Sequence, residues 1–251
     1  MSAMVHKYYR LGGLTFGVRS EYPILDSSVF ACEASAPDYE IIIKAENSFT
    51  PDRTAQGCAR TKRLDRTIYL TMKEAQAKAL SVFSLFNAFD LPGLLLENSR
   101  FVLHASFVLH NGEAILFTGA SGIGKSTQAE LWRQTRGANI VNGDRALVGL
   151  SDGKAAAHGY INCGSSGICQ NISAPIRAVV ILGRSTENTV WKPGGIEAFK
   201  ALVGQCAYDV TSRRQVEEII NLLAEMIPQV KILRLDCTNT PSAVECLERA
   251  L

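Results

Sequence analysis

The chain has 251 residues, of which 47% are hydrophobic and 20% charged, and its formal net charge is +2. This composition suits a soluble globular protein of one large or two modest domains, and it gives no reason to expect a nucleic-acid or membrane partner. Seven scattered cysteines, no C-x-x-C pair and no signal-peptide pattern predict reduced, mostly buried thiols in a cytoplasm, and no zinc site.

The first part of the chain has strand composition. Three segments are rich in β-branched and aromatic residues and predict strands: 8–18, 39–44 and 67–70. The polar stretch 46–59 contains proline and glycine, which favours a loop. The basic run that begins at Arg60 predicts a solvated loop or the edge of a sheet.

A helix is predicted next. Thr71 with Glu74 three residues later matches a capping box, and apolar residues follow at helical spacing as far as Pro92-Gly93. We therefore expect a β-rich domain over residues 1–99, closed by this helix, and a second domain over residues 100–251.

The second domain opens on a hairpin. Phe101–Leu109 has strand composition, and Asn111-Gly112 is the dipeptide typical of a tight two-residue turn. The apolar segment 114–118 then returns antiparallel and leads into a glycine-rich loop.

That loop spells G-x-x-x-x-G-K-[ST] from Gly119 to Ser126, between a strand and a helix, as a phosphate-binding P-loop requires. Its glycines let backbone N–H groups turn inward onto phosphate oxygens. Lys125 would reach the β- and γ-phosphates of ATP or another NTP, and the Ser126 hydroxyl would ligate Mg²⁺. The predicted nucleotide-binding residues are Gly119, Ala120, Ser121, Gly122, Ile123, Gly124, Lys125, Ser126 and Thr127. The alternative is a structural glycine turn.

The rest of the chain alternates helices and strands. Gly137 is expected to end the helix that follows the loop, and Ser212 with Gln215 predicts a capped helix. The other expected elements are strands at 138–141, 178–182 and 230–235, a hairpin of 145–150 with 155–158, a helix at 196–203, and a last helix from Pro241.

Two side chains are candidates for the chemistry of phosphoryl transfer. Asp144 ends the strand after the loop helix, so it would assist the metal or act as a base toward an acceptor hydroxyl; otherwise it is a turn residue after Gly143. His104 lies beside the strand that feeds the loop, where an imidazole could stabilise the γ-phosphate or relay a proton; otherwise it is structural.

Other residues leave their alternatives open. His158 ends a strand and could approach the site, and segment 159–167 is either an acceptor-binding loop or a plain connection. Trp132 and Trp191 are expected to pack. Three arginines could contact phosphate or acceptor, although the second could equally be a structural anchor: Arg145, Arg177 and Arg184.

Together these features resemble the kinase domain of the HPr kinase/phosphorylase family and its phosphoenolpyruvate-carboxykinase-like relatives. The matching residues are Leu103-His104-Ala-Ser106, the hairpin, Gly119–Thr127 and Val141-Asn-Gly-Asp144-Arg145, all within Phe101–Leu182. The family carries an acidic pair where this chain has Gly143-Asp144, so the first acid is missing. The resemblance implies an α/β fold with a mixed sheet, a hairpin entering the P-loop and a β-rich N-terminal domain.

The chain is most similar to the shorter relatives associated with peptide-modification clusters. That resemblance implies a cytoplasmic, Mg²⁺- and ATP-dependent kinase that phosphorylates a hydroxyl, such as a serine, on a peptide or protein acceptor, and a homo-oligomer by analogy. The N-terminal domain and the 159–167 loop are candidates for acceptor recognition. The alternatives are a nucleotide-binding accessory module without chemistry and a kinase of a small hydroxylated metabolite.

Overall fold

The computed structural model describes residues 5–25, 28–47, 59–151 and 153–251. Two compact units follow one another along the chain, Met1–Leu91 and Pro92–Leu251. The division falls somewhat before the expected boundary at Ser99, because Leu96 is already buried in the core of the second unit.

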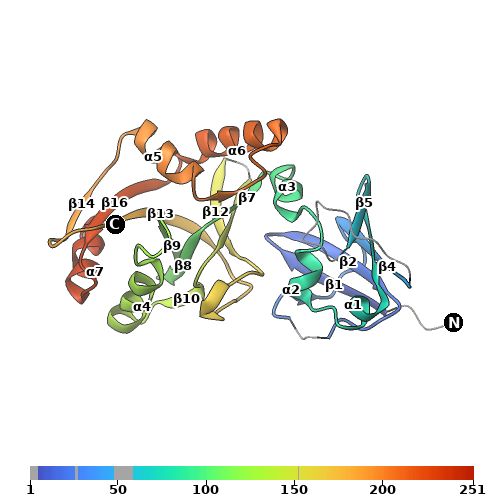
Figure 1. Ribbon diagram of the computed structural model, residues 1–251. Helices are drawn as coiled ribbons and strands as arrows, with labels where there is room; N and C mark the ends of the chain where they lie inside the picture. The colour runs from blue at the N-terminus through green and yellow to red at the C-terminus, as the bar shows by residue number, and fades with distance from the viewer. Residues whose placement is uncertain (1–4, 26–27, 48–58, 152) are drawn as a thin grey trace. The chain divides into compact units, whose positions relative to one another are not determined.

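The first unit is built on a mixed sheet with strand order β3-β1-β2-β4-β6-β5 (Figure 1). Its strands are β1 (Val5–Leu11), β2 (Leu14–Ser20), β3 (Ala31–Cys32), β4 (Tyr39–Glu46), β5 (Arg60–Leu64) and β6 (Thr67–Lys73). The parallel pairs are β2 with β4 and β4 with β6, and the other pairs are antiparallel. The basic run at Arg60 forms the edge strand β5, one of its two expected positions.

Two expectations for this unit were wrong in detail. Segment 8–18 is not one strand, because Gly12 and Gly13 adopt positive φ and turn the chain into the β1–β2 hairpin. Thr71 does not cap a helix, because it lies within β6 and pairs with both Arg60 and Lys44. Most of the loop expected at 46–59 lies outside the described residues.

Three short helices replace the single expected one. They are α1 (Glu74–Lys78), α2 (Val82–Phe86) and α3 (Leu91–Leu96). Ser81 caps α2 by accepting a hydrogen bond from the Ser84 N–H at 3.1 Å. Pro92 does not close the region, because it lies in the first turn of α3, where its missing N–H costs no helical hydrogen bond.

The second unit contains a larger mixed sheet, with strand order β10-β8-β9-β13-β12-β11-β7-β15 and with β16 and β14 attached beside β13. Its strands are β7 (Arg100–Leu103), β8 (Ala105–His110), β9 (Glu113–Thr118), β10 (Asn139–Asn142), β11 (Ala146–Ser151), β12 (Lys154–Gly159), β13 (Ser173–Arg184), β14 (Thr189–Trp191), β15 (Cys206–Ala207) and β16 (Lys231–Cys237).

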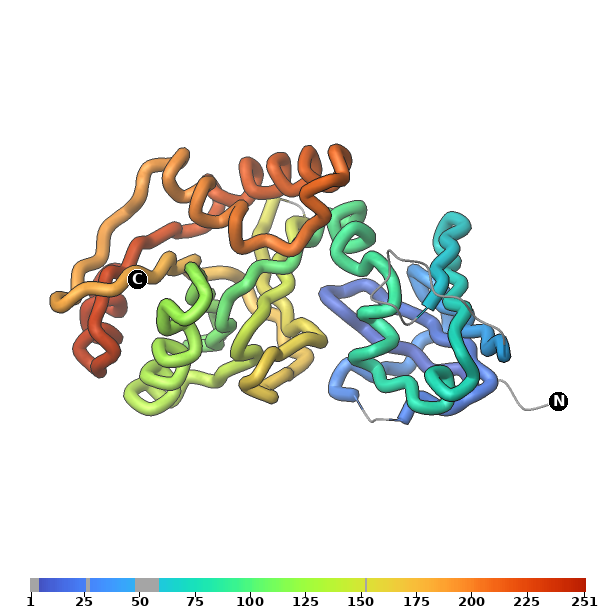
Figure 2. The backbone as a smooth tube through the Cα atoms, viewed as in Figure 1, coloured from blue at the N-terminus to red at the C-terminus, as the bar shows by residue number. Residues whose placement is uncertain are grey.

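The long strand β13 joins the two parts of this sheet, as the chain trace in Figure 2 shows. Its beginning pairs antiparallel with β12, and its remainder runs parallel to β9 and β16. The segment expected as one strand, Phe101–Leu109, is likewise divided. It breaks at His104, whose N–H donates to Gln205 O at 2.8 Å, so β7 pairs with β11 and β15 while β8 pairs with β9 and β10.

Helices cover both faces of the parallel strands. Helices α4 (Lys125–Arg136) and α7 (Pro241–Glu248) pack on one face, and α5 (Gly195–Val203) and α6 (Arg213–Met226) on the other (Figure 1). The side chains of strand β9 point alternately to these two faces. Ile115 and Phe117 belong to the core under α4 and α7, whereas Leu116 belongs to the core under α5 and α6. Strand β9 is therefore held between two cores, and it fixes the position of the loop that leads into α4.

Several local predictions are confirmed. The Asn111-Gly112 turn has two positive φ values and joins β8 to β9 in register, and Gly137 ends α4 in the left-handed conformation. All the described cysteines are free, but their burial differs from expectation, because of these Cys237 alone is buried. Among the described residues, no helix combines the length and the apolar character needed to cross a membrane.

Candidate active site

The glycine-rich loop lies between the end of β9 at Thr118 and the start of α4. Gly119, Gly122 and Gly124 have φ values of 141°, 71° and 117°, which residues other than glycine rarely adopt. A side chain at Gly119 would also crowd the backbone of Leu182 on β13 at 3.3 Å. The glycines are therefore needed for the loop conformation itself.

Lys125, the first residue of α4, folds back over this loop. Its ammonium group donates to Gly119 O at 3.0 Å and to Ala120 O at 3.2 Å, and the residue is only 7% exposed. Burial lowers the pKa of Lys125, and the nearby Asp144 carboxylate opposes that shift. The loop thus contains a buried cation held by carbonyl oxygens that anionic groups could replace.

The turn after β10 is held by Asn142, which is fully buried. Its side-chain carbonyl accepts from the N–H groups of Asp144 and Arg145 at 3.0 and 2.9 Å. Its amide donates to Tyr160 O at 2.7 Å and to Asn162 O at 3.2 Å. One buried side chain therefore forms hydrogen bonds with backbone groups of both the turn and residues 160–162, and this fixes the position of Asp144.

The carbonyl of Gly143 connects this turn to the loop helix. It accepts hydrogen bonds from Ser106 Oγ on β8 at 2.7 Å and from Ser126 Oγ on α4 at 3.5 Å. Ser106 is fully buried, which makes its bond the structural one. The longer contact of Ser126 leaves that hydroxyl at the boundary between the loop and the Asp144 turn.

Asp144 lies between an imidazole and a guanidinium. Its Oδ1 is 3.1 Å from His104 Nε2, and its Oδ2 accepts from Arg145 Nε at 3.3 Å. The three side chains are each about a third exposed, at 33% for His104, 29% for Asp144 and 34% for Arg145. The carboxylate is therefore oriented on both sides and still open to solvent.

His104 is positioned by the strand break. Its carbonyl accepts from Thr118 Oγ1 at 2.9 Å, so the residue is tied to the last position before the glycine loop. Burial and the neighbouring Lys125 lower the pKa of His104, and Asp144 opposes the shift. The lowered pKa favours the neutral imidazole, and in that form its contact with Asp144 is a hydrogen bond rather than an ion pair.

The 159–167 segment lies against Asp144. Its 3-10 turn Gly164–Ser166 begins at a glycine with φ 55°, and a side chain there would come within 3.0 Å of Asp144 Cβ. A side chain at Gly143 would overlap Ser166. The structure places the segment beside the carboxylate, and the acceptor-binding role expected as one of its two alternatives stays a prediction.

The remaining candidate residues differ in whether they contact the glycine loop. Arg184 donates to Gly122 O at 2.7 Å, whereas Arg177 bonds Glu113 and the Leu251 carbonyl and is a structural anchor. His158 bonds Ser173 across the β12–β13 pair. The packing expected of both tryptophans holds for one of them: Trp132 is fully buried, but Trp191 is 42% exposed on the short strand β14.

Three further residues of the candidate site had no role predicted from the sequence, although the first two lie within its matching motifs: Asn142, Ser106 and Asn239. Asn239 Oδ1 would be 3.2 Å from a Cβ at Gly124, so the loop after β16 touches the glycine loop. Strands β9, β13 and β16 are parallel, so their carboxyl ends meet at one edge. The rule that ligands bind at such an edge could have indicated Asn239.

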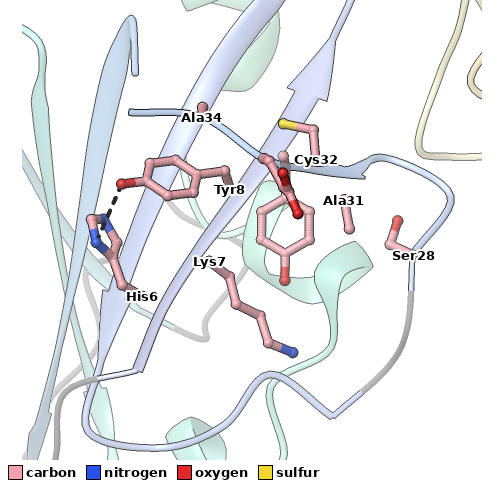
Figure 3. Close-up of a pocket in the computed structure, with 9 residues that line it drawn as sticks. His6, Lys7, Tyr8, Ser28, Ala31, Cys32 and Ala34 are labelled. Atoms are coloured by element: carbon pink, nitrogen blue, oxygen red, sulfur yellow. Dashed lines mark hydrogen bonds between the residues drawn. The ribbon is translucent and has the colours of Figure 1, made fainter. Parts of the chain in front are cut away.

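The first unit has an open cavity of about 530 Å³ beside β1 and β3 (Figure 3). Its polar lining includes His6, Lys7 and Tyr8, and the Tyr8 hydroxyl lies 3.4 Å from His6 Nδ1. Lys7 donates to Ile24 O at 3.3 Å. This cavity contains none of the residues that were predicted to carry chemistry.

No family model matches the chain, and no curated protein matches it. Among solved structures, the Hpr(Ser) kinase/phosphatase from Coxiella burnetii is similar over 59% of this chain and 94% of its own, at 15% sequence identity and a TM-score of 0.35. A TM-score of this size does not establish a common function.

Proposed function

We propose that the chain is a Mg²⁺-dependent phosphotransferase that uses ATP, or another NTP, to phosphorylate a hydroxyl group on a peptide or protein. The observation that carries this proposal is the 3.5 Å contact between Ser126 Oγ and Gly143 O. It brings the start of α4 to the turn that presents Asp144, which His104 contacts from the break between β7 and β8. Phosphoryl transfer needs this combination of phosphate cradle, metal ligand and base.

The loop residues fit a polyphosphate chain. Lys125 already satisfies its charge with two loop carbonyls, so an incoming phosphate would offer it a stronger partner. The first N–H groups of α4 add the positive end of the helix dipole. Arg184, bonded to Gly122, adds a second cation at the loop.

The residues also fit Mg²⁺. No group of three or more His, Cys, Asp and Glu side chains within the described ranges is arranged to hold a metal ion. The Ser126 hydroxyl nevertheless suffices as a direct protein ligand, with Asp144 reaching the ion through a bound water, because Mg²⁺ takes most of its ligands from substrate phosphates and water. When bound, the ion would neutralise charge on the transferred phosphoryl group.

Asp144 is the proposed base. Its carboxylate is oriented by His104 and Arg145, is exposed enough to meet an acceptor, and would accept the proton of the attacking hydroxyl. The neutral imidazole of His104 donates to Asp144 without competing for that proton. The cavity beside β1 in the first unit supports a role for that unit in holding a peptide acceptor.

A non-catalytic nucleotide-binding module is the second candidate. The observation that favours it is the lone carboxylate at the turn, because Gly143 stands where the HPr kinase/phosphorylase family, which the chain resembles, has another acid. Such a module would bind ATP tightly without turnover.

The test is Lys125→Ala, assayed for transfer of labelled phosphate from ATP to serine peptides. Loss of the buried cation should lower transfer by about 10²-fold or more, with an unchanged circular dichroism spectrum. The control is Lys200→Ala, which removes an exposed lysine from α5. Unaltered turnover in Lys125→Ala would refute the site, and ATP binding with no transfer to any hydroxyl acceptor would favour the accessory module.

A further inference from the structure

The 160–170 segment is tied to the strand that carries the proposed base. Asn142 donates to the carbonyls of Tyr160 and Asn162 at one end of the segment. At the other end the Gln170 N–H donates to Val141 O at 2.9 Å. The intervening turn is thus held over the end of β10.

Within this segment, two residues touch the proposed catalytic turn directly. Gly164 packs on the side chain of Asp144 so closely that a Cβ would reach its carboxylate, and Ser166 fills the space that any side chain at Gly143 would occupy. The 3-10 turn therefore covers the side of Asp144 and Gly143 on which it packs. Ser166 is thus a hydroxyl of this segment that lies directly against the turn carrying the proposed base.

Ser166 is also accessible for reaction. It is exposed, and its hydroxyl donates to Cys163 O at 2.7 Å and accepts from the Ile168 N–H at 3.3 Å. Both bonds are local to the turn. Because Ser166 contacts Gly143, and Gly143 O contacts Ser126 Oγ, the two serine hydroxyls lie within about 10 Å of each other by covalent dimensions.

We propose that Ser166 is an intramolecular phosphorylation site of this chain. The inference rests on the proposed kinase function and adds an acceptor to it. In this proposed transfer the 3-10 turn rearranges so that Ser166 Oγ meets the γ-phosphate held at the glycine loop. A bond forms between Ser166 Oγ and the γ-phosphorus, the bond from that phosphorus to the β–γ bridging oxygen breaks, the hydroxyl proton passes to Asp144, and ADP leaves.

The experiment incubates the purified full-length chain with Mg²⁺ and ATP and maps phosphopeptides by mass spectrometry. One phosphoryl group is expected on Ser166, and it should be lost completely in Ser166→Ala. The matched control is Ser165→Ala, which removes the adjacent exposed hydroxyl and should keep the modification.

Two further measurements identify the transfer as self-catalysed and intramolecular. The first-order rate constant should not change with protein concentration, and the Lys125→Ala chain should stay unlabelled even when mixed with wild type. Labelling of that variant by wild type, or modification at another residue, would overturn the inference.

The outcome also distinguishes this inference from the proposed function. Transfer to serine peptides without any modification of Ser166 would overturn the intramolecular site and leave the kinase assignment standing. No transfer to a peptide and none to Ser166, despite ATP binding, would overturn both.

Discussion

At the scale of single residues, Gly143 determines how close the turn at Ser166 can come. Its φ is not in the left-handed region, so its backbone would accept alanine without strain. What excludes a side chain is the Ser166 side chain, whereas the Ser166 Cα would lie 4.0 Å from a Cβ added at Gly143. A carboxylate at this position would therefore have to displace the turn.

Gly143→Ala should therefore destabilise the second unit by about 1–3 kcal/mol, the usual cost of overpacking. Because the clash involves only side-chain atoms of Ser166, adding Ser166→Gly should recover most of that loss. Chemical denaturation of the two single variants and the double variant measures the coupling. Strictly additive effects would show that the two residues are not in contact.

At the scale of elements, α4 shows how local signals fix the limits of the site helix. Lys125 begins it directly after the left-handed Gly124, and Gly137 ends it with φ 63°. Apolar residues of α4 such as Trp132 bury into the core over β8 and β9. Glycine at each end therefore sets the helix length, while packing fixes its position.

Gly137→Ala should cost about 1 kcal/mol, because an alanine Cβ would meet nothing within 4 Å and only the left-handed backbone opposes it. Gly195→Ala, at the start of α5, also meets nothing within 4 Å but has an ordinary φ, so it should be stabilising by roughly 0.5 kcal/mol. Urea denaturation of both variants provides the comparison. Equal effects of the two substitutions would contradict this account.

Elements with strong local signals could be predicted from the sequence. The Asn111-Gly112 turn has its own positive φ values, and Ser212 caps α6 by accepting from the Gln215 N–H. The Thr71 cap failed because strand pairing on both sides of β6 outweighs one capping interaction. The break at His104 could not be predicted, because it depends on a carbonyl more than a hundred residues later, that of Gln205.

The geometry of the candidate site was predictable to a similar extent. The glycine loop and Asp144 follow from motif and strand order. The contact of Asp144 with His104 requires the antiparallel pairing of β8 with β10, and one of these strands precedes α4 along the chain while the other follows it. The role of Asn142 could not be predicted, because a buried amide with four partners looks like any turn asparagine until its partners are placed.

At the scale of the whole molecule, the two units carry different parts of the proposed function. The second contains the glycine loop, the Asp144 turn and two apolar cores on opposite faces of its sheet. The first contains a sheet with a basic edge strand and an open cavity. The second unit also contains partly buried titratable groups, and these should make its free energy of unfolding depend on pH.

His158 makes this stability depend on pH. Burial and the neighbouring Arg100 lower its pKa to about 4, below the value of about 6.5 in an unfolded chain. The unfolded state then binds more protons between these values, so the free energy of unfolding should fall by up to ~3 kcal/mol as pH drops from about 6.5 to about 4. The lowered pKa of His104 acts in the same direction.

Thermal unfolding followed across this pH range is the measurement. His158→Gln should flatten the decline, and His6→Gln, which removes an exposed imidazole from the first unit, is the control. A decline as steep in His158→Gln as in wild type would show that other groups are responsible.

The hydrogen bonds of Asn142 also bear on how the molecule ages. The chain contains two Asn-Gly dipeptides, at Asn111 and at Asn142, and this pairing is the one most prone to deamidation through a cyclic imide. Asn111 is exposed at a hairpin tip, whereas the amide of Asn142 is enclosed and bonded at both ends. In the folded protein, chemical damage on storage should accumulate at the hairpin and spare the turn that holds the proposed base.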